Sequence, residues 1–504
     1  MTISSSAPAN ARAPVPSGRP AWPIVFLLLF VWALIFQGSR GIYEPDEGFY
    51  GNAAHNMLVH GDWLVPRLDN GPFLDKPPFS LWSTAAGMRL LGVNEWGARF
   101  GHALWFALAA LLVGRIAARL IGPQARFPAT IAYALMPLPF VGANIITPDT
   151  PLACWSALAV DAYLASRSEL GRWRYPMLCG FAVGLGILTK GPAMLMLATP
   201  LAIDRLFDFR RRPWLPDVAA AMVAAAVGLS WYILVAQKLP GAAAYFIDNQ
   251  VAGRLVKADY GRNPGVLGAL IYIPVLLVGG LPFSLTWFRR LREAWRNRAW
   301  RGLTQRPTER FIALWLGLPL GVLLLAQSRL PLYALPLCAP LAVLAVRPES
   351  GTGGLLATPW SKRARTGLCA WAVLLIAVKG IGAVWPAPQD SRAVAAALAA
   401  IEPDHATPVV VVETKRNGLA LYGWSDLRQA VLVRNAYKFF TLAPRLADLL
   451  PQIEARRIAV VTSPGNLAPA TTVLREAGWS CRASAAPGKT AFLTCDAPAI
   501  AAPR

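Results

Sequence analysis

Charged residues are scarce in this chain. Only 15% of its 504 residues are charged, whereas a soluble domain averages about 25%. Acidic residues are the scarcer kind, with 27 Asp and Glu against 49 Lys and Arg, and 55% of all residues are hydrophobic. This balance argues against an ordinary soluble enzyme and predicts a protein that crosses a bilayer many times.

Cysteine is also rare, and the six Cys form no CxxC pair and no metal-binding spacing. Four lie in or beside apolar segments, where we expect them to be packing residues: Cys154, Cys179, Cys338 and Cys369. Cys481 and Cys495 share the C-terminal tail and could pair if that tail is in an oxidising compartment.

The basic surplus gives a formal net charge of +22. In a soluble protein such a charge would suggest a nucleic-acid partner. Here the Arg residues lie mainly in short gaps between apolar runs, which is the pattern of cytoplasmic loops in membrane proteins. We therefore expect a protein surrounded by membrane lipids, with no nucleic-acid partner.

Apolar runs of about span length recur along residues 22–385. With about 20 residues per span, we expect about eleven spans, and up to thirteen. Basic clusters alternate with acidic or motif-bearing turns, so the N-terminus is predicted in the cytoplasm and the C-terminus outside. The predicted spans lie near 22–36, 97–114, 127–146, 151–166, 175–188, 191–206, 216–236, 266–288, 311–326, 331–346 and 366–385, and 79–92 is an interfacial helix or a short span.

Three regions follow from this division. Residues 1–20 read as a disordered cytoplasmic leader, with a signal peptide as the alternative. Residues 21–386 form the transmembrane domain, with periplasmic loops at 40–78 and 237–264. In residues 387–504, short β-branched runs alternate with helix-like segments, which predicts a small periplasmic α/β domain.

The candidate site residues lie in turns on the outer face. Asp46, Glu47 and Tyr50 follow the first span, and a solvated acidic loop is the alternative for them. Asp75 and Lys76 directly precede an apolar helix, where a Lys either extends to the interface or meets an anionic headgroup.

Further candidates lie at later helix junctions. Asp149 is either functional or simply the cap of the next helix. Lys190 lies between two short apolar runs, and ionisable groups at membrane depth tend to be functional or paired. The remaining candidates in outer turns are Arg67, Arg254, Arg329 and Tyr333. A pump or channel would instead need ionisable residues throughout its spans, so these turns favour an enzyme acting on a lipid headgroup.

The order of these motifs resembles bacterial glycosyltransferases of the GT-C superfamily. The pattern is most similar to the lipid A 4-amino-4-deoxy-L-arabinose transferases, which are related to protein O-mannosyltransferases. The resemblance covers about residues 22–345. Its motifs are Asp46-Glu47 with Tyr50, Gly61-Asp62-Trp63 to Pro66-Arg67, Asp75-Lys76-Pro77 with Trp82, Leu188-Thr189-Lys190-Gly191, Trp231-Tyr232, and Leu330-Pro331 with Tyr333 and Pro336.

The resemblance implies an α-helical GT-C membrane fold and a sugar donor on undecaprenyl or another polyprenyl phosphate. It implies that Lys76, Arg254 and Tyr333 contact the donor phosphate. The family's acidic positions correspond to Asp46, Glu47 and Asp149, and Asp46 would orient or deprotonate the acceptor. The acceptor would be lipid A, another glycolipid or a protein, and a transporter or flippase of lipid-linked sugars is the alternative from another class.

Two positions depart from the family pattern. The chain has Phe49 where the lipid A enzymes have Arg, and Asn249 where they have His. The resemblance therefore requires no cofactor, and a divalent metal is left as an open alternative.

Overall fold

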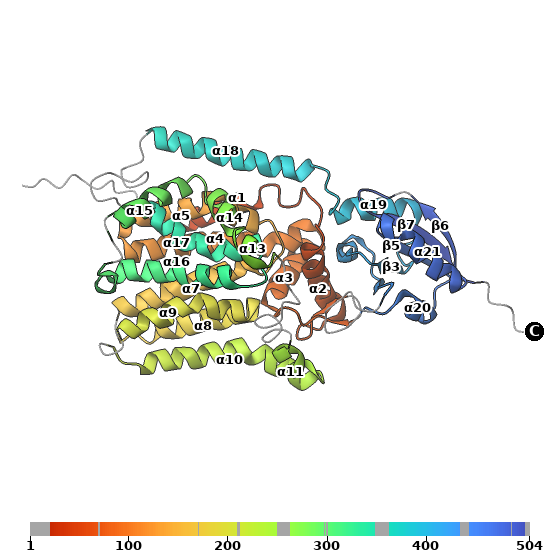
Figure 1. Ribbon diagram of the computed structural model, residues 1–504, viewed down its shortest axis with the longest axis horizontal. Coiled ribbons are helices and arrows are strands. Elements are labelled where there is room, and N and C mark those ends of the chain that lie inside the picture. Colours follow the sequence, from red (N-terminus) through yellow and green to blue (C-terminus); the bar gives the residue numbers. More distant parts are fainter. Residues whose placement is uncertain are drawn as a thin grey trace, which may run out of the picture.

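The chain folds into a helical bundle with a sheet domain at one end of its long axis (Figure 1). The computed structural model describes residues 21–68, 71–169, 171–208, 212–248, 263–296, 298, 301–347, 362–433, 443–484 and 486–498. Most bundle helices run along the long axis, so their ends face either the sheet domain or the opposite side.

The bundle begins with α1 (Trp22–Leu34), and α2 (Asp46–His60) then leads through the short pair β1 (Arg67–Leu68) and β2 (Gly71–Pro72) into α3 (Phe79–Leu91). The bundle continues with α4 (Glu95–Leu120), α5 (Arg126–Leu135), α6 (Pro137–Gly142), α7 (Asp149–Ser168), α8 (Arg174–Lys190), α9 (Pro192–Phe207), α10 (Leu215–Lys238), α11 (Ala242–Tyr245), α13 (Gly265–Ala269), α14 (Tyr272–Gly279), α15 (Ser284–Arg296), α16 (Pro307–Leu325), the 3-10 helix η5 (Pro331–Leu337), α17 (Cys338–Val346) and α18 (Lys362–Val384).

Four described helices are long and apolar enough to cross a bilayer on their own: α4, α10, α16 and α18. The number rises to five if the helices on either side of the bend between 279 and 284 count as one span. Several other predicted spans are shorter helices, such as α8 with 17 residues and α9 with 16. The chain is a multi-pass helical protein, and the larger span count stays a prediction.

Two predicted spans are broken in the structure. The run at 127–146 divides into α5 and α6, because Pro137 follows α5 and cannot donate the amide that would continue it. The run at 266–288 divides into α13, α14 and α15, with a 113° bend before Ser284. Hydropathy alone could not locate these breaks, since the residues on both sides remain apolar.

Close packing of α8 against α10 fixes the helix that ends at Lys190. A Cβ on Gly180 would lie 2.2 Å from the Ala220 carbonyl oxygen, and one on Gly228 would lie 2.9 Å from the Ile187 side chain. Small residues at such crossings let helix backbones approach closely, which is the usual device in membrane bundles.

The C-terminal domain is a five-stranded sheet with helices on both faces, in the order β4-β3-β5-β7-β6. Strand β3 (Val409–Val412) pairs in parallel with β4 (Leu427–Ala430) and β5 (Arg457–Thr462), whereas β7 (Ala491–Asp496) is antiparallel to β5 and to β6 (Ser480–Ser484). The helices of this domain include α19 (Ser391–Ile401), η6 (Asn417–Tyr422), α20 (Leu446–Leu449) and α21 (Leu467–Glu476). The predicted small α/β domain is confirmed, and its boundary at residue 386 stays a prediction.

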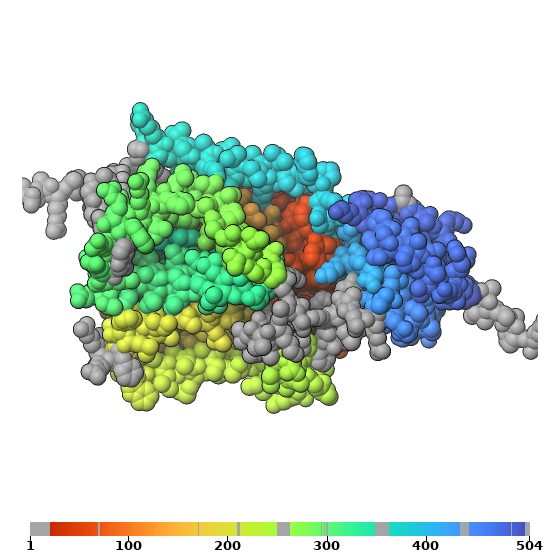
Figure 2. All heavy atoms as spheres, in the orientation of Figure 1, coloured from red at the N-terminus to blue at the C-terminus, as the bar shows by residue number. Residues whose placement is uncertain are grey.

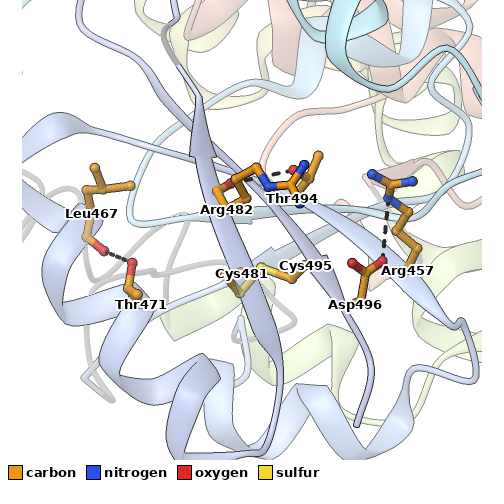
Figure 3. Close-up of a disulfide and its surroundings, with 8 residues drawn as sticks. All are labelled: Arg457, Leu467, Thr471, Cys481, Arg482, Thr494, Cys495 and Asp496. Carbon is orange, nitrogen blue, oxygen red and sulfur yellow. Dashed lines mark hydrogen bonds and ion pairs between the residues drawn. A yellow bond between two sulfur atoms is a disulfide. The ribbon is translucent and has the colours of Figure 1, made fainter. Parts of the chain in front are cut away.

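A disulfide joins the last two strands of this sheet. Cys481 on β6 lies directly opposite Cys495 on β7, with their Cα atoms 4.1 Å apart (Figure 3). The pairing of the two tail cysteines that the sequence allowed is therefore present. Of the other four Cys, Cys369 is exposed and Cys154 and Cys338 are buried in the bundle.

Candidate functional site

The first turn of α2 faces the junction between the bundle and the sheet domain. Figure 2 shows orange-red atoms of this N-terminal part between light-green α13, cyan α18 and the blue C-terminal domain. Asp46 is the first residue of α2, where a carboxylate is favoured by the helix dipole. It is half-buried, so its carboxylate remains within reach of a substrate.

Tyr50 lies one turn further along α2 and is surrounded by acidic groups. Burial raises the pKa of its hydroxyl well above the ordinary value, and the charges of Asp75, Asp46 and Asp149 raise it further. Tyr333 also contributes to this rise. Tyr50 is thus an un-ionised hydroxyl at neutral pH, and these groups, which are distant in sequence, surround it.

Lys190, Asp149 and the partly buried Tyr333 form one cluster. The Lys190 ammonium lies 2.5 Å from a carboxylate oxygen of Asp149, and both side chains are at most 8% exposed. The same ammonium lies 3.8 Å from the centre of the Tyr333 ring, a cation–π contact. The end of α8, the start of α7 and η5 thus bring together residues that the sequence offered separately.

The second lysine of the site also has a neighbouring carboxylate. Lys76 forms an ion pair with Asp75, and its side chain is 12% exposed. Both residues precede α3, so this pair lies at the mouth of the bundle rather than within a helix. The exposure of Lys76 is close to that of Lys190, whose side chain is 8% exposed, but Lys76 lies in the loop before α3 whereas Lys190 ends α8.

Glu47 differs from Asp46 in being fully enclosed. Its carboxylate pairs with Arg40 at 2.5 Å and with Arg99 at 2.8 Å, and it accepts the backbone amides of Tyr43 and Ile146. Burial acts to raise the pKa of Glu47, but the two guanidinium groups prevail and hold it well below its usual range. This geometry supports a role in holding α2 against α4 and the loop before α7, with Asp46 as the acidic group open to substrate.

Sequence reasoning did not single out Arg40 and Arg99. Arg99 is 0% exposed and also donates to the carbonyls of residues 37, 40 and 41. A signal was available, because Arg99 is an ionisable residue inside a predicted span, where such groups are normally paired.

The Gly61–Pro66 motif forms a tight turn held by two tryptophans. The Asp62 carboxylate accepts the amides of Leu64 and Val65, which is the geometry of an Asx turn. The indole of Trp82 donates to the Trp63 carbonyl at 2.8 Å, and that of Trp231 donates to the Leu64 carbonyl at 2.7 Å. Three motifs of the resemblance therefore meet in one structural turn.

The remaining predicted residues are Arg329, Arg67 and Arg254. The Arg329 guanidinium is buried and donates to the backbone carbonyls of 263, 265, 323 and 324, so it joins the start of α13 to the last turn of α16. Arg67 lies in β1 and makes no ion pair with any residue that the structure describes. Arg254 lies outside the described residues.

Parts of this chain are similar in sequence to known proteins. Residues 75–236 match the family model described as dolichyl-phosphate-mannose-protein mannosyltransferase. Among curated relatives, an undecaprenyl phosphate-alpha-4-amino-4-deoxy-L-arabinose arabinosyl transferase of Serratia proteamaculans is 30% identical over 65% of this chain. The same-named protein of Edwardsiella ictaluri is 28% identical over 64% of this chain. The matched regions span 59% and 58% of those relatives.

Solved structures decide the architecture. ArnT from Cupriavidus metallidurans, bound to undecaprenyl phosphate, superposes with a TM-score of 0.74 at 20% identity and covers 94% of this chain and 98% of that one. The chain has the GT-C glycosyltransferase fold. An oligosaccharyltransferase of Archaeoglobus fulgidus shares this fold more distantly, with a TM-score of 0.54 at 14% identity over 90% of this chain and 71% of that one. The expected resemblance to GT-C enzymes and the fold it implied are confirmed.

The described residues offer no metal centre. Within the described ranges, no group of three or more His, Cys, Asp or Glu residues could hold a metal ion. Asn249, where the lipid A enzymes have His, lies outside those ranges. The described residues therefore do not fit a bound metal ion.

Proposed function

We propose that this chain transfers a sugar from a polyprenyl phosphate to lipid A or another glycolipid on the periplasmic side of the bacterial inner membrane. The observation that carries this proposal is the cluster of Lys190, Asp149, Tyr333 and Tyr50 at one end of a GT-C bundle. The relatives are named undecaprenyl phosphate-alpha-4-amino-4-deoxy-L-arabinose arabinosyl transferases, which supports the same donor class.

The donor phosphate needs cations at the mouth of the bundle. Negative charge builds on it as the bond between the sugar and the phosphate oxygen breaks, and positioned charges lower that barrier. Lys76 is the cation best placed for this role, because it is partly exposed and stands before α3. Tyr333 would donate its hydroxyl to the same phosphate, and Lys190 holds the Tyr333 ring in place.

The charges around Tyr50 favour a further cation when the donor binds. Asp46, Asp75 and Asp149 supply three negative charges, whereas Lys76 and Lys190 supply two positive ones. A bound phosphate adds more negative charge, which another basic residue would offset. Arg254 is our prediction for that residue.

Asp46 would act on the acceptor. If the acceptor is a hydroxyl, the half-buried carboxylate would take its proton as a general base. If the acceptor is a phosphate of lipid A, it is already anionic, and Asp46 would orient it instead. Attack in line with the departing phosphate would invert the anomeric centre of the sugar.

A protein acceptor is the second candidate. The family model that matches residues 75–236 is described by protein mannosylation, and this segment carries Lys76, Asp149 and Lys190. The two candidates share the donor half of the reaction and differ only in what receives the sugar.

The test is Lys76→Ala, with Lys489→Ala on the exposed surface of the C-terminal domain as the matched control. Mass spectrometry of lipid A and of polyprenyl-phosphate sugars would be compared for cells with each variant. We expect Lys76→Ala to abolish the mass shift on lipid A and to leave donor accumulating, whereas the control keeps wild-type transfer.

The same experiment separates the alternatives. A shift on a protein in place of lipid A would establish the protein acceptor. Sugar that crosses the bilayer without a new glycosidic bond would establish a transporter. Full transfer by a folded Lys76→Ala protein would overturn the assignment of Lys76.

A further inference from the structure

We propose that the C-terminal sheet domain is a positioning element of the site, with Glu44, Ser391 and Arg392 as positioning residues for Asp46. This inference rests on the proposed function for the role of Asp46. The contacts of the three positioning residues and the first test do not depend on sugar transfer. The sheet domain would thus hold the reacting end of α2 rather than only cover it.

The chain segment before α2 is paired with the start of the C-terminal domain. The amide of Ser391 donates to the Ile42 carbonyl at 2.9 Å, and the amide of Glu44 donates to the Gln389 carbonyl at 2.9 Å. Tyr43 and Asp390 form an antiparallel bridge between these bonds. Residues 42–44, directly before Asp46, therefore pair like a short strand with residues 389–391, which lie about 350 positions later in the sequence.

The Glu44 side chain continues into the sheet domain. Its carboxylate accepts the Ser391 hydroxyl at 2.9 Å and the Gly418 amide at 2.6 Å, and Glu44 is only 8% exposed. A Cβ on Gly418 would lie 3.0 Å from the same oxygen, so glycine permits this approach. A buried carboxylate needs such donors, since burying it without them is costly.

A second carboxylate fastens the same junction from α4. Glu95 pairs with Arg392 at 2.7 Å and accepts the Tyr422 hydroxyl at 2.7 Å. Arg392 also donates to the carbonyls of Gly38 and Ser39, and the Tyr422 oxygen accepts the Ile42 amide. The residues that precede α2 are thus held by side chains from α19 and η6.

Asp46 lies between two glutamates that are held by different parts of the protein. Glu44 is bound by the sheet domain, and Glu47 is bound by Arg40 and Arg99 of the bundle. Loss of the interactions of either glutamate should let the first turn of α2 move relative to Lys76 and Tyr333. A displacement of about 1 Å in such a site can reduce turnover about a hundredfold.

The first test is hydrogen exchange measured by mass spectrometry on the full chain in detergent. We expect Ser391→Ala and Glu44→Ala to speed exchange of the 46–50 amides at least about tenfold while the amides of α10 are unchanged. Glu44→Gln should stay close to wild type, because its amide oxygen still accepts both hydrogen bonds. Arg475→Ala, on an exposed turn of α21, is the control. Unchanged exchange at 46–50, or an equal rise in α10, would overturn the proposal.

The second test is the rate of transfer by the same variants, with polyprenyl-phosphate sugar and lipid A as substrates. We expect kcat to fall at least about tenfold in Ser391→Ala while KM for the donor changes less than about twofold, since Lys76 and Tyr333 are untouched. Equal kcat in variant and wild type would contradict the positioning role. A wild-type protein without transfer would instead refute the proposed function and leave the exchange result standing.

Discussion

At the scale of single residues, the buried pair of Lys190 and Asp149 allows stability and chemistry to be separated. Lys190→Met leaves the Asp149 carboxylate buried and unpaired, which typically costs about 3–5 kcal/mol of unfolding free energy. The double variant Lys190→Met with Asp149→Asn removes both charges and should recover most of that loss. We expect it to remain inactive in transfer, because Tyr333 loses the ammonium that holds its ring.

Thermal unfolding of the purified variants in detergent would check this prediction. Lys379→Met is unsuitable as a control, since its ammonium bonds the Ala33 carbonyl, so Lys489→Met on the exposed surface is used. A single Lys190→Met variant as stable as wild type would show that the pair is solvated and contributes little.

The lowered pKa of Glu47 predicts how its contribution to stability depends on pH. Its pKa is lowered in the folded state, so its stabilisation is fully present above the ordinary value near 4.5 and is lost only as the pH falls through the lower folded value. Glu47→Gln should therefore lower the unfolding free energy by about 3 kcal/mol or more, by the same amount at every pH from 5 to 8. Unfolding midpoints of both proteins across that range test this, and a difference that varies with pH between 6 and 8 would contradict it.

The site residues were predictable singly, but their partners were not. Asp149, Lys190 and Tyr333 each stood out as polar groups at helix junctions in an apolar chain. Their meeting depends on how α7, α8 and η5 pack, and the Lys190 pair joins residues 41 positions apart. Arg329 was expected in the site because it lies in a predicted outer turn, yet its guanidinium donates to backbone carbonyls, which a local sequence pattern does not reveal.

At the scale of elements, the helices were well predicted where they are continuous and less so where they break. The predicted helix at 79–92 is α3 (Phe79–Leu91), and the predicted span at 366–385 is α18. The breaks near 136 and between 279 and 284 depend on proline and on packing inside apolar runs, which hydropathy averages away. In the C-terminal domain, β-branched runs identified β3 and β5, whereas the strand order follows from long-range pairing.

The Gly61–Pro66 turn gives the prediction at this scale. Trp231→Phe keeps an aromatic ring but removes the N–H that reaches the Leu64 carbonyl. We expect a loss of about 1–3 kcal/mol, because a buried acceptor is left without its donor. Trp385→Phe, at an exposed position after α18, is the matched control. Chemical unfolding would measure the free energy of unfolding of both variants. An equal loss in both would contradict this role for Trp231.

At the scale of the whole molecule, the two ends of the bundle carry different chemistry. α9 begins beside Lys190 and ends near Asp204, about 20 Å away at 1.5 Å per residue. At that far end Asp204 pairs with Arg167 in the last turn of α7 and Arg310 in the first turn of α16, beside basic loops predicted to be cytoplasmic. The sheet domain and its disulfide lie at the Lys190 end (Figure 1).

This polarity predicts which positions can be labelled from outside a cell. Arg475→Cys lies on an exposed turn of α21, and Arg172→Cys lies in the exposed loop between α7 and α8. In a background with the four free cysteines changed to Ala, a membrane-impermeant maleimide should label 475 in intact spheroplasts and 172 only after permeabilisation. The disulfide between Cys481 and Cys495 agrees with this direction, since such bonds persist in oxidising compartments. The reverse labelling pattern would place the sheet domain and the site in the cytoplasm, where a periplasmic acceptor could not reach Asp46.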